Sequence, residues 1–118
     1  MRSYIFNFSA QKVKKLGIKG QPAFILNYLD QFFKSGHSKD PVEYQNKIYY
    51  WIEASKVAKD LDFLGIQSQR IRQYFDFLCE KGVLSKYPPD GPDYSKTKLR
   101  LHINYNLLVD QVDGDLNQ

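Results

Sequence analysis

The stretch GIQSQRIRQYFDFLCEKGVL, residues 65–84, places apolar side chains at helical spacing and stops at a glycine. Recurrence every three or four positions is typical of a helix that buries one face. The residues that we expect to face the core are Ile71, Tyr74, Phe75 and Leu78. The first turn holds only glutamine, serine and arginine. This helix is therefore expected to present hydrogen-bonding side chains, and no catalytic group, where it begins.

A second short helix is expected just before this one, in EASKVAKDLDFLG, residues 53–65. Val57, Ala58 and Leu61 fall on one helical face. A glycine then breaks the pattern, and Ile66 is the lone apolar residue in the turn. Two short helices joined by a turn that contains glycine predict a helix-turn-helix.

A β-hairpin is expected directly after the second helix. VLSKYP, residues 83–88, is typical of a strand that two prolines end. In KLRLHINY, residues 98–105, Leu99, Leu101 and Ile103 alternate with polar side chains, which predicts a strand with one apolar face. The segment between the two strands is rich in turn residues and would form a long tip. A hairpin in this position is what forms a wing.

The remaining segments flank this unit. PAFILNYLDQFFKSG, residues 22–36, carries an apolar stripe behind a proline at the first helical position, and is expected to be the core helix. HSKDPVEYQNK, residues 37–47, is polar and without periodicity, and is expected to be an exposed loop. IYYWI, residues 48–52, is rich in β-forming residues and is expected to be a strand.

The two ends of the chain carry weaker patterns. SYIFNFS, residues 3–9, alternates as a short strand or extended arm does. Ser9 is expected to cap a brief helix that Gly17 ends, and NLLVDQV, residues 106–112, to form a closing helical turn. The sequence therefore divides into an amino-terminal arm with a short strand and helix, the main domain and a carboxy-terminal tail, at residues 1–20, 21–104 and 105–118.

The expected fold class is α+β, as a winged helix-turn-helix with a three-helix core, a C-terminal β-hairpin wing and an N-terminal extension. Residues 51–84 resemble the winged-helix family of bacterial and phage DNA-binding domains, through SKVAKDL as first helix, LGI as turn, QRIRQYFDFL as recognition helix and EKGVL as the exit toward the wing. The resemblance extends over roughly residues 22–104. YYWI and DLDFLGI also resemble amino-terminal domains of phage and plasmid replication proteins, including replisome organisers. No long dimerisation helix or effector domain is evident, which disfavours a repressor.

A recognition helix enters the major groove with its amino-terminal end and outer face. Glutamine can pair with adenine, arginine with guanine, and serine can reach a base edge or a phosphate. Residues 67–75 contain no acid that would repel phosphates. The competing interpretation is a solvated helix face that carries polar residues without a partner. The candidate DNA-binding residues of this helix are Gln67, Ser68, Gln69, Arg70, Arg72 and Gln73.

Basic residues outside the helix supply candidate phosphate contacts. Those of the wing are Lys86, Lys96, Lys98 and Arg100, and those elsewhere are Lys12, Lys14, Lys15 and Lys56. Asp90 and Asp93 near the tip argue against deep insertion of the wing into a groove. A solvated edge strand protected by lysines is the competing explanation for the wing cations.

The totals bound the class of protein. A chain of 118 residues is the size of one domain, and its net charge of +4 is mildly basic, which favours a polyanion as partner without proving one. Residues 1–20 contain five basic residues and no acid, whereas the tail after Tyr105 carries three aspartates and no base. No segment has the signature of a signal peptide or membrane span, and the single cysteine fits a reducing compartment. We expect a cytoplasmic protein.

The sequence offers no support for an enzyme. His37 and His102 lie in different expected elements, and neither is spaced from Cys79 as metal ligands are. Glycine-rich nucleotide-binding motifs are missing from the sequence, and no nucleophile has a plausible base beside it. We therefore predict neither a cofactor, nor a bound metal, nor a small-molecule substrate.

Two functional hypotheses follow. The first is sequence-specific binding of double-stranded DNA, in replication initiation or transcriptional regulation of a bacterial, phage or plasmid system. It allows for a homodimer, since such domains often bind near-palindromes, or for a replication or regulatory protein as partner. Leu107, Leu108 and Val109 or the aromatic strand are candidates for a dimer contact. The second is a winged-helix adaptor that binds proteins and not DNA, whose interface would be supplied by the tyrosines expected to be exposed, Tyr49, Tyr50, Tyr87 and Tyr94.

Overall fold

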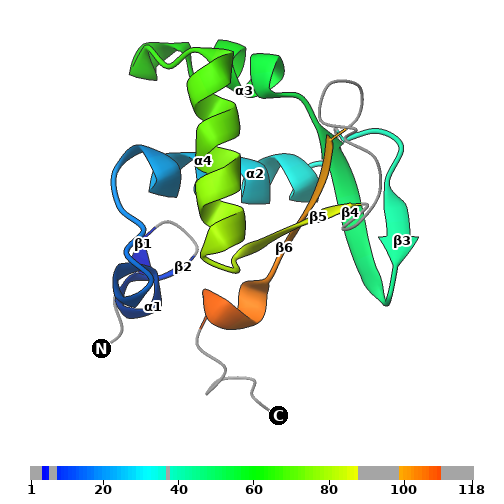
Figure 1. Cartoon of the computed structure of the whole chain (residues 1–118), viewed down its shortest axis with the longest axis horizontal. Coiled ribbons are helices and arrows are strands. Elements are labelled where there is room, and N and C mark those ends of the chain that lie inside the picture. The colour runs from blue at the N-terminus through cyan, green and yellow to red at the C-terminus, as the bar shows by residue number, and fades with distance from the viewer. Residues whose placement is uncertain (1–3, 6–7, 37, 88–98, 110–118) are drawn as a thin grey trace.

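The computed structural model describes residues 4–5, 8–36, 38–87 and 99–109, and it has an α+β fold with three main helices and a four-strand antiparallel sheet (Figure 1). The main helices are α2 (Gln21–Lys34), α3 (Ala54–Asp60) and α4 (Ser68–Glu80). The strands of the sheet are β3 (Val42–Tyr44), β4 (Lys47–Ile52), β5 (Leu84–Tyr87) and β6 (Leu99–Ile103). Smaller elements are β1 (Tyr4–Ile5), β2 (Phe8–Ser9), α1 (Ala10–Lys15) and two 3₁₀ turns, η1 (Asp62–Leu64) and η2 (Tyr105–Leu107).

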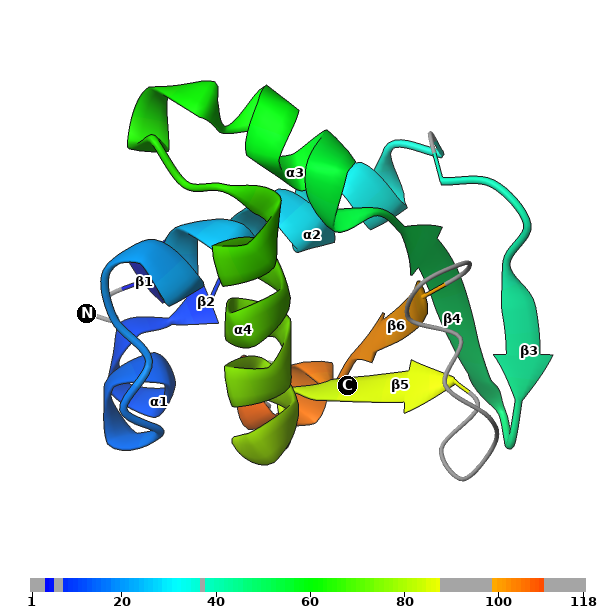
Figure 2. The ribbon, with the colours of Figure 1, turned by 45° about the horizontal axis from the view of Figure 1, so that its top comes forward.

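The sheet joins strands from both halves of the chain in the order β3-β4-β6-β5. β5 and β6 pair antiparallel from Leu84 opposite Ile103 to Tyr87 opposite Arg100, which confirms the hairpin predicted after α4. Its tip, residues 88–98, lies outside the described residues. β6 also pairs with β4, so the strand that precedes α3 closes against the hairpin that follows α4. This pairing holds α3 and α4 at one side of the sheet (Figure 2).

The core lies between the helices and one face of the sheet. Leu26 and Leu29 from α2, Val57 from α3 and Leu101 from β6 are all fully buried, and the Phe33 ring stacks on Tyr50 of β4 at a centroid distance of 4.9 Å. The apolar stripe of residues 22–36 therefore lies in the core, as expected for the core helix. Among the described residues, no helix combines the length and the apolarity that crossing a membrane requires.

The prediction of an exposed loop over residues 37–47 is wrong in part, because residues 42–44 form β3. β3 and β4 make a tight hairpin whose turn residues Gln45 and Asn46 have φ of 51° and 66°. Two consecutive positive φ values match the right-handed twist of paired strands. The signal was weak because the turn lacks the usual glycine and the strand has only three residues.

The amino-terminal extension is fastened to the carboxy-terminal end of the described chain. β1 and β2 pair with each other, where the sequence indicated one strand or an arm. Ser9 caps α1 as predicted, with its side chain accepting a hydrogen bond from the Lys12 amide. The Ser9 amide donates to the Leu108 carbonyl at 2.7 Å. The predicted closing turn is η2, which begins one residue earlier than expected.

Candidate nucleic-acid interface

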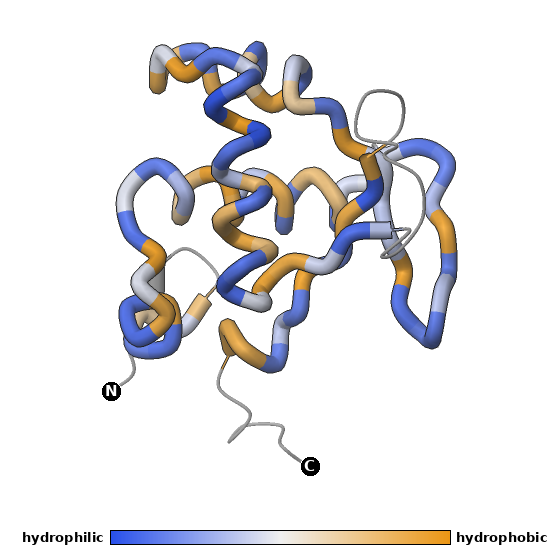
Figure 3. Tube along the Cα trace, viewed as in Figure 1, coloured by the Kyte–Doolittle hydropathy of each residue, from blue (hydrophilic) through white to orange (hydrophobic). Residues whose placement is uncertain are grey.

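The outer face of α4 carries the polar residues that the sequence singled out. Ile71, Phe75 and Leu78 are buried and fix the orientation of the helix. Ser68 is half-buried, and the exposed members of the predicted set are Gln67, Gln69, Arg70, Arg72 and Gln73. Figure 3 shows hydrophilic residues in the first turns of α4, interrupted by a single apolar one. The structure thus places all six predicted residues together at one end of one helix.

The turn before α4 is fixed by two residues. Gly65 has a φ of 66°, in the left-handed region that a residue with a Cβ adopts only with strain. Ile66, the lone apolar residue of the turn, is buried and packs into the core. Gln67 then takes the cap position of α4 with an extended backbone, and its side chain makes no capping hydrogen bond. The amino-terminal end of the helix is therefore held by the turn and the core.

Tyr74 lies at the rim of the core, although the sequence placed it inward with Phe75. Its side chain is half-buried, and its hydroxyl donates a hydrogen bond of 2.6 Å to the Gln21 side-chain oxygen at the start of α2. The Arg70 guanidinium lies over the same ring, with its carbon 6.0 Å from the ring centroid. Tyr74 thus links a side chain of α2 to a side chain of the predicted recognition face.

Residues from α2, the turn and α4 enclose an open hollow of about 630 Å³. Four glutamines contribute to its lining together with Arg70 and Tyr74, and no carboxylate does. Gln21 is the member that the sequence did not suggest, because it lies 46 positions before Gln67 and no local pattern connects them. The first acid of α4, Asp76, is six residues after Arg70, roughly 9 Å along the helix axis.

The wing cations differ in their surroundings. Lys86 is exposed on β5, on the side of the sheet that faces α4, where its charge acts on the Cys79 thiol. Arg100 is engaged by the chain itself, because its guanidinium contacts the Asp40 carboxylate at 2.6 Å and also donates to the Asp40 carbonyl. Lys96 and Lys98 lie outside the described residues.

The predicted phosphate contacts outside α4 and the wing lie in three different settings. Lys12 donates to the carbonyls of Asn106 and Val109, at 3.3 and 2.8 Å. Lys56 pairs with Asp60 within α3 at 3.4 Å. The remaining two, Lys14 and Lys15, are exposed on α1.

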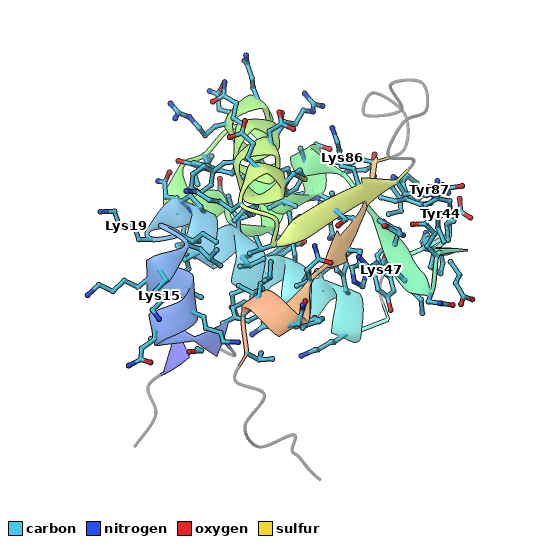
Figure 4. The ribbon with its side chains drawn as sticks, turned by 60° about the horizontal axis from the view of Figure 1, so that its bottom comes forward. Lys15, Lys19, Tyr44, Lys47, Lys86 and Tyr87 are labelled. Atoms are coloured by element: carbon cyan, nitrogen blue, oxygen red, sulfur yellow. The ribbon has the colours of Figure 1, made fainter. Side chains whose placement is uncertain are left out.

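α1 lies at the far end of α4 from the polar face. A Cβ placed at Gly17, just after α1, would lie 3.4 Å from the Nζ of Lys81, which follows α4. Lys81 is 14 positions beyond Gln67, roughly 20 Å along a helix. Lys15 and Lys19 also lie away from Lys86 and Tyr87 (Figure 4). The structure therefore does not bring α1 to the polar face of α4.

The described residues contain no group of three or more histidine, cysteine or acidic side chains that could hold a metal ion. Burial raises the pKa of the half-buried Cys79 thiol to about 11, despite the opposing effect of Lys86, so the thiol is protonated at neutral pH. The hydrogen bond from the Tyr28 hydroxyl lowers the pKa of Asp60, with Lys56 and Lys59 acting in the same direction.

Comparison of the chain with protein-family models, with curated proteins and with solved structures finds no match.

Proposed function

We propose that this chain is a winged-helix domain that binds double-stranded DNA in a sequence-specific way, in replication initiation or transcriptional regulation of a bacterial, phage or plasmid system. The observation that carries the proposal is the polar face of α4, residues 67–73, which contains two arginines and no acid and stands at the amino-terminal end of an anchored helix. The element order also supports it: the helix α2, the hairpin of β3 and β4, the helices α3 and α4 joined through η1 and Gly65, and a second hairpin whose strand β6 pairs with β4.

The residues of α4 have distinct expected roles. Arginine presents two donors to the O6 and N7 acceptors of guanine, and glutamine pairs with the N6 and N7 of adenine. We assign base reading to Arg70 and Arg72 and to the glutamines beside them. The free amide groups of the first turn of α4 favour a nearby phosphate.

Supporting contacts come from outside α4. Lys86 supplies a positive charge beside α4, and among the wing cations it is the one that we include in the proposed DNA interface. Arg100 and Lys12 are left out of the proposed interface, since both are bonded to the chain itself. Phosphate contacts would fix the register of the domain on the duplex without reading its sequence.

The test compares two pairs of cations. Arg70→Ala with Arg72→Ala and the matched control Lys14→Ala with Lys15→Ala remove the same charge from exposed positions at opposite ends of α4. Duplex affinity is measured at low and moderate salt by titration of a labelled duplex that the wild type has selected from a random-sequence pool. We expect the wild type to weaken as salt rises, and the arginine variant to lose about tenfold or more for each arginine that reads a base. The lysine control should change little.

Two results would overturn the proposal. Wild-type protein that leaves duplex DNA unbound at low salt would point to the protein-binding adaptor instead. Equal losses in the arginine and lysine pairs would mean that binding follows net charge and not the α4 face. If the proposal holds, the sequences selected from the random duplex pool give the DNA site, and enrichment of a palindrome would indicate a homodimer.

A further inference from the structure

The face of the sheet turned away from the helices carries aromatic side chains that the proposed duplex contact does not use. Alternation along β4 puts Tyr49 on this outer face, whereas Tyr50 points to the core and stacks on Phe33. The register of β5 and β6 places Tyr87 and His102 on the same outer side. The hairpin of β3 and β4 adds Tyr44, so four rings from four strands meet on one surface.

The rings form a continuous cluster. Centroid distances are 5.2 Å between Tyr44 and Tyr87, 5.6 Å between Tyr49 and Tyr87, and 5.6 Å between Tyr49 and His102. Tyr49, which the sequence led us to expect exposed, is only 5% exposed because the neighbouring rings cover it, and it forms the floor of the cluster. Tyr44, Tyr87 and His102 are half-buried and form its outer surface. Tyr44 and Tyr87 lie next to one another at one edge of the molecule (Figure 4).

The charge of this face is positive. Lys47 is exposed and lies directly opposite Tyr44 in the register of β3 and β4. Glu43 points to the other side of the hairpin because neighbouring residues of a strand alternate. Within the described strands, the outer face thus contains no carboxylate. Asp40, outside the strands, is bound to Arg100.

We infer that the outer face of the sheet binds single-stranded nucleic acid. Its bases would stack on the rings of Tyr44 and Tyr87, and its phosphates would contact Lys47. Proteins that bind single-stranded nucleic acid without sequence preference combine aromatic rings, on which the bases stack, with positive charges that contact the phosphate backbone. DNA and RNA share the bases and phosphates on which this recognition depends.

A second copy of the chain is a poorer occupant. In a symmetric contact each residue near the axis meets its counterpart or a neighbour of it, so Lys47 would approach the same positive charge on the second copy. A protein interface also tends to exclude lysine from its centre. The cluster combines rings with a positive charge, and a single strand supplies flat bases together with negative phosphates.

This surface is separate from the proposed duplex contact. α4 packs on the core face of the sheet, and the cluster lies on the opposite face. The inference therefore does not depend on the role of Arg70 and Arg72. A domain with both surfaces would be able to hold a duplex and a separated strand at the same time.

The test measures binding of labelled oligothymidylate and oligouridylate of about 12 nucleotides, within the usual range for one small domain. We expect both to bind at low salt and to quench the fluorescence of Trp51, the single tryptophan, which lies on the outer face beside the cluster. Replacing Tyr44 and Tyr87 together by alanine should weaken binding by about tenfold or more, because each tyrosine ring that is removed takes away the stacking contact of one base. Tyr44→Phe with Tyr87→Phe should retain binding.

Two further variants separate this surface from α4 and from misfolding. Lys47→Glu changes an exposed side chain, so it should weaken strand binding while the melting temperature stays near the wild-type value. Arg70→Ala with Arg72→Ala should keep oligothymidylate binding and lose duplex binding. Failure of wild-type protein to bind either oligonucleotide, or full binding by the alanine and Lys47→Glu variants, would overturn the inference. So would dimerisation in sedimentation experiments that the same variants abolish, since the face would then be an interface between copies.

Discussion

Residues 67–75 of α4 and residues 8–19 of the amino-terminal extension both carry basic side chains and no carboxylate. In α4, three buried side chains turn Arg70 and Arg72 outward, and Arg70 lines the open hollow. In the extension, Lys12 is bonded to the carbonyls of the carboxy-terminal turn, and Lys14 and Lys15 stand at the other end of α4. Segments of similar composition therefore differ in role: we propose that α4 recognises DNA, whereas the amino-terminal extension is bonded to the carboxy-terminal turn of the same chain.

The comparison teaches that a basic segment is not an interface by virtue of its charge. A cation can contribute to ligand binding when it is exposed on a surface that fits the ligand. It contributes to the stability of the fold when carbonyls or carboxylates of the chain bind it. Lys56 and Arg100 belong to the second group, because Asp60 and Asp40 hold them. Variants that exchange matched cations test this distinction directly.

The largest expected effect is on the anchor of α4. Ile71→Ala removes a fully buried side chain between the two arginines, and should lower the free energy of unfolding by about 2–5 kcal/mol through lost burial and a remaining cavity. Urea denaturation followed by circular dichroism measures it. A change below about 0.5 kcal/mol would mean that Ile71 does not hold the helix.

The next effect separates the two basic regions. Arg70→Ala should weaken duplex binding by about 1–3 kcal/mol if the guanidinium reads a base. Lys15→Ala removes the same charge but should change the binding free energy by a few tenths of a kcal/mol at most. Lys15 lies about the length of α4 away from the polar face, a distance over which salt screens its charge. Fluorescence anisotropy at one salt concentration gives both values. Equal losses would remove the distinction between the regions.

Tyr74 tests whether the polar face is held in position. Tyr74→Phe keeps the ring under Arg70 and removes the hydrogen bond to Gln21, so duplex affinity should fall by about 0.5–1.5 kcal/mol. Gln21→Ala should cost a similar amount, and the double variant should cost less than the sum. Strict additivity in this cycle would show that the two side chains act independently.

A smaller effect is expected for the fastening of the extension. Lys12→Ala loses two hydrogen bonds to carbonyls near the carboxy-terminal turn and should lower the free energy of unfolding by about 1 kcal/mol. Lys14→Ala is the matched control, because it removes the same charge from an exposed position of α1. Thermal unfolding of the two variants side by side should show a lower melting temperature for Lys12→Ala alone.

The smallest effect is a dependence of stability on pH. The pKa of Asp60 is lowered in the folded chain, first by the Tyr28 hydrogen bond, so its contribution is present at neutral pH. That contribution should disappear as the pH falls below about 4 and Asp60 becomes protonated. Tyr28→Phe should flatten this acid-limb dependence. Melting curves between pH 3 and about 7 measure it, and identical curves for both proteins would exclude the hydrogen bond as the cause.

Local patterns predicted much of this fold. The helices around Leu26, Val57 and Ile71 follow the 3.6-residue spacing of their apolar side chains, and β6 follows the alternation that puts Leu101 inward. The cap at Ser9 and the turn at Gly65 depend on residues next to them in sequence. All of these features depend on chain neighbours a few positions apart, and sequence reasoning therefore reached them.

Features with weak local patterns or distant partners were missed or misjudged. β3 pairs with the next segment of the chain, yet its three residues carry too little pattern of their own to predict a strand. The contact of Tyr74 with Gln21 joins two helices, and the bond of Arg100 with Asp40 joins a strand to a loop. The aromatic cluster combines side chains of four strands, and no single strand contains more than one of its four rings.

The sequence by itself determined that Gln69, Arg70, Arg72 and Gln73 face outward, because Ile71, Phe75 and Leu78 occupy the buried face of the same helix. Only the tertiary structure decided which cations remain available: Lys12 and Arg100 are engaged by partners that are distant in the sequence, whereas Arg70 and Arg72 stay exposed. The physical reason is that the direction of a side chain follows from local backbone geometry, while its partners depend on how the elements pack.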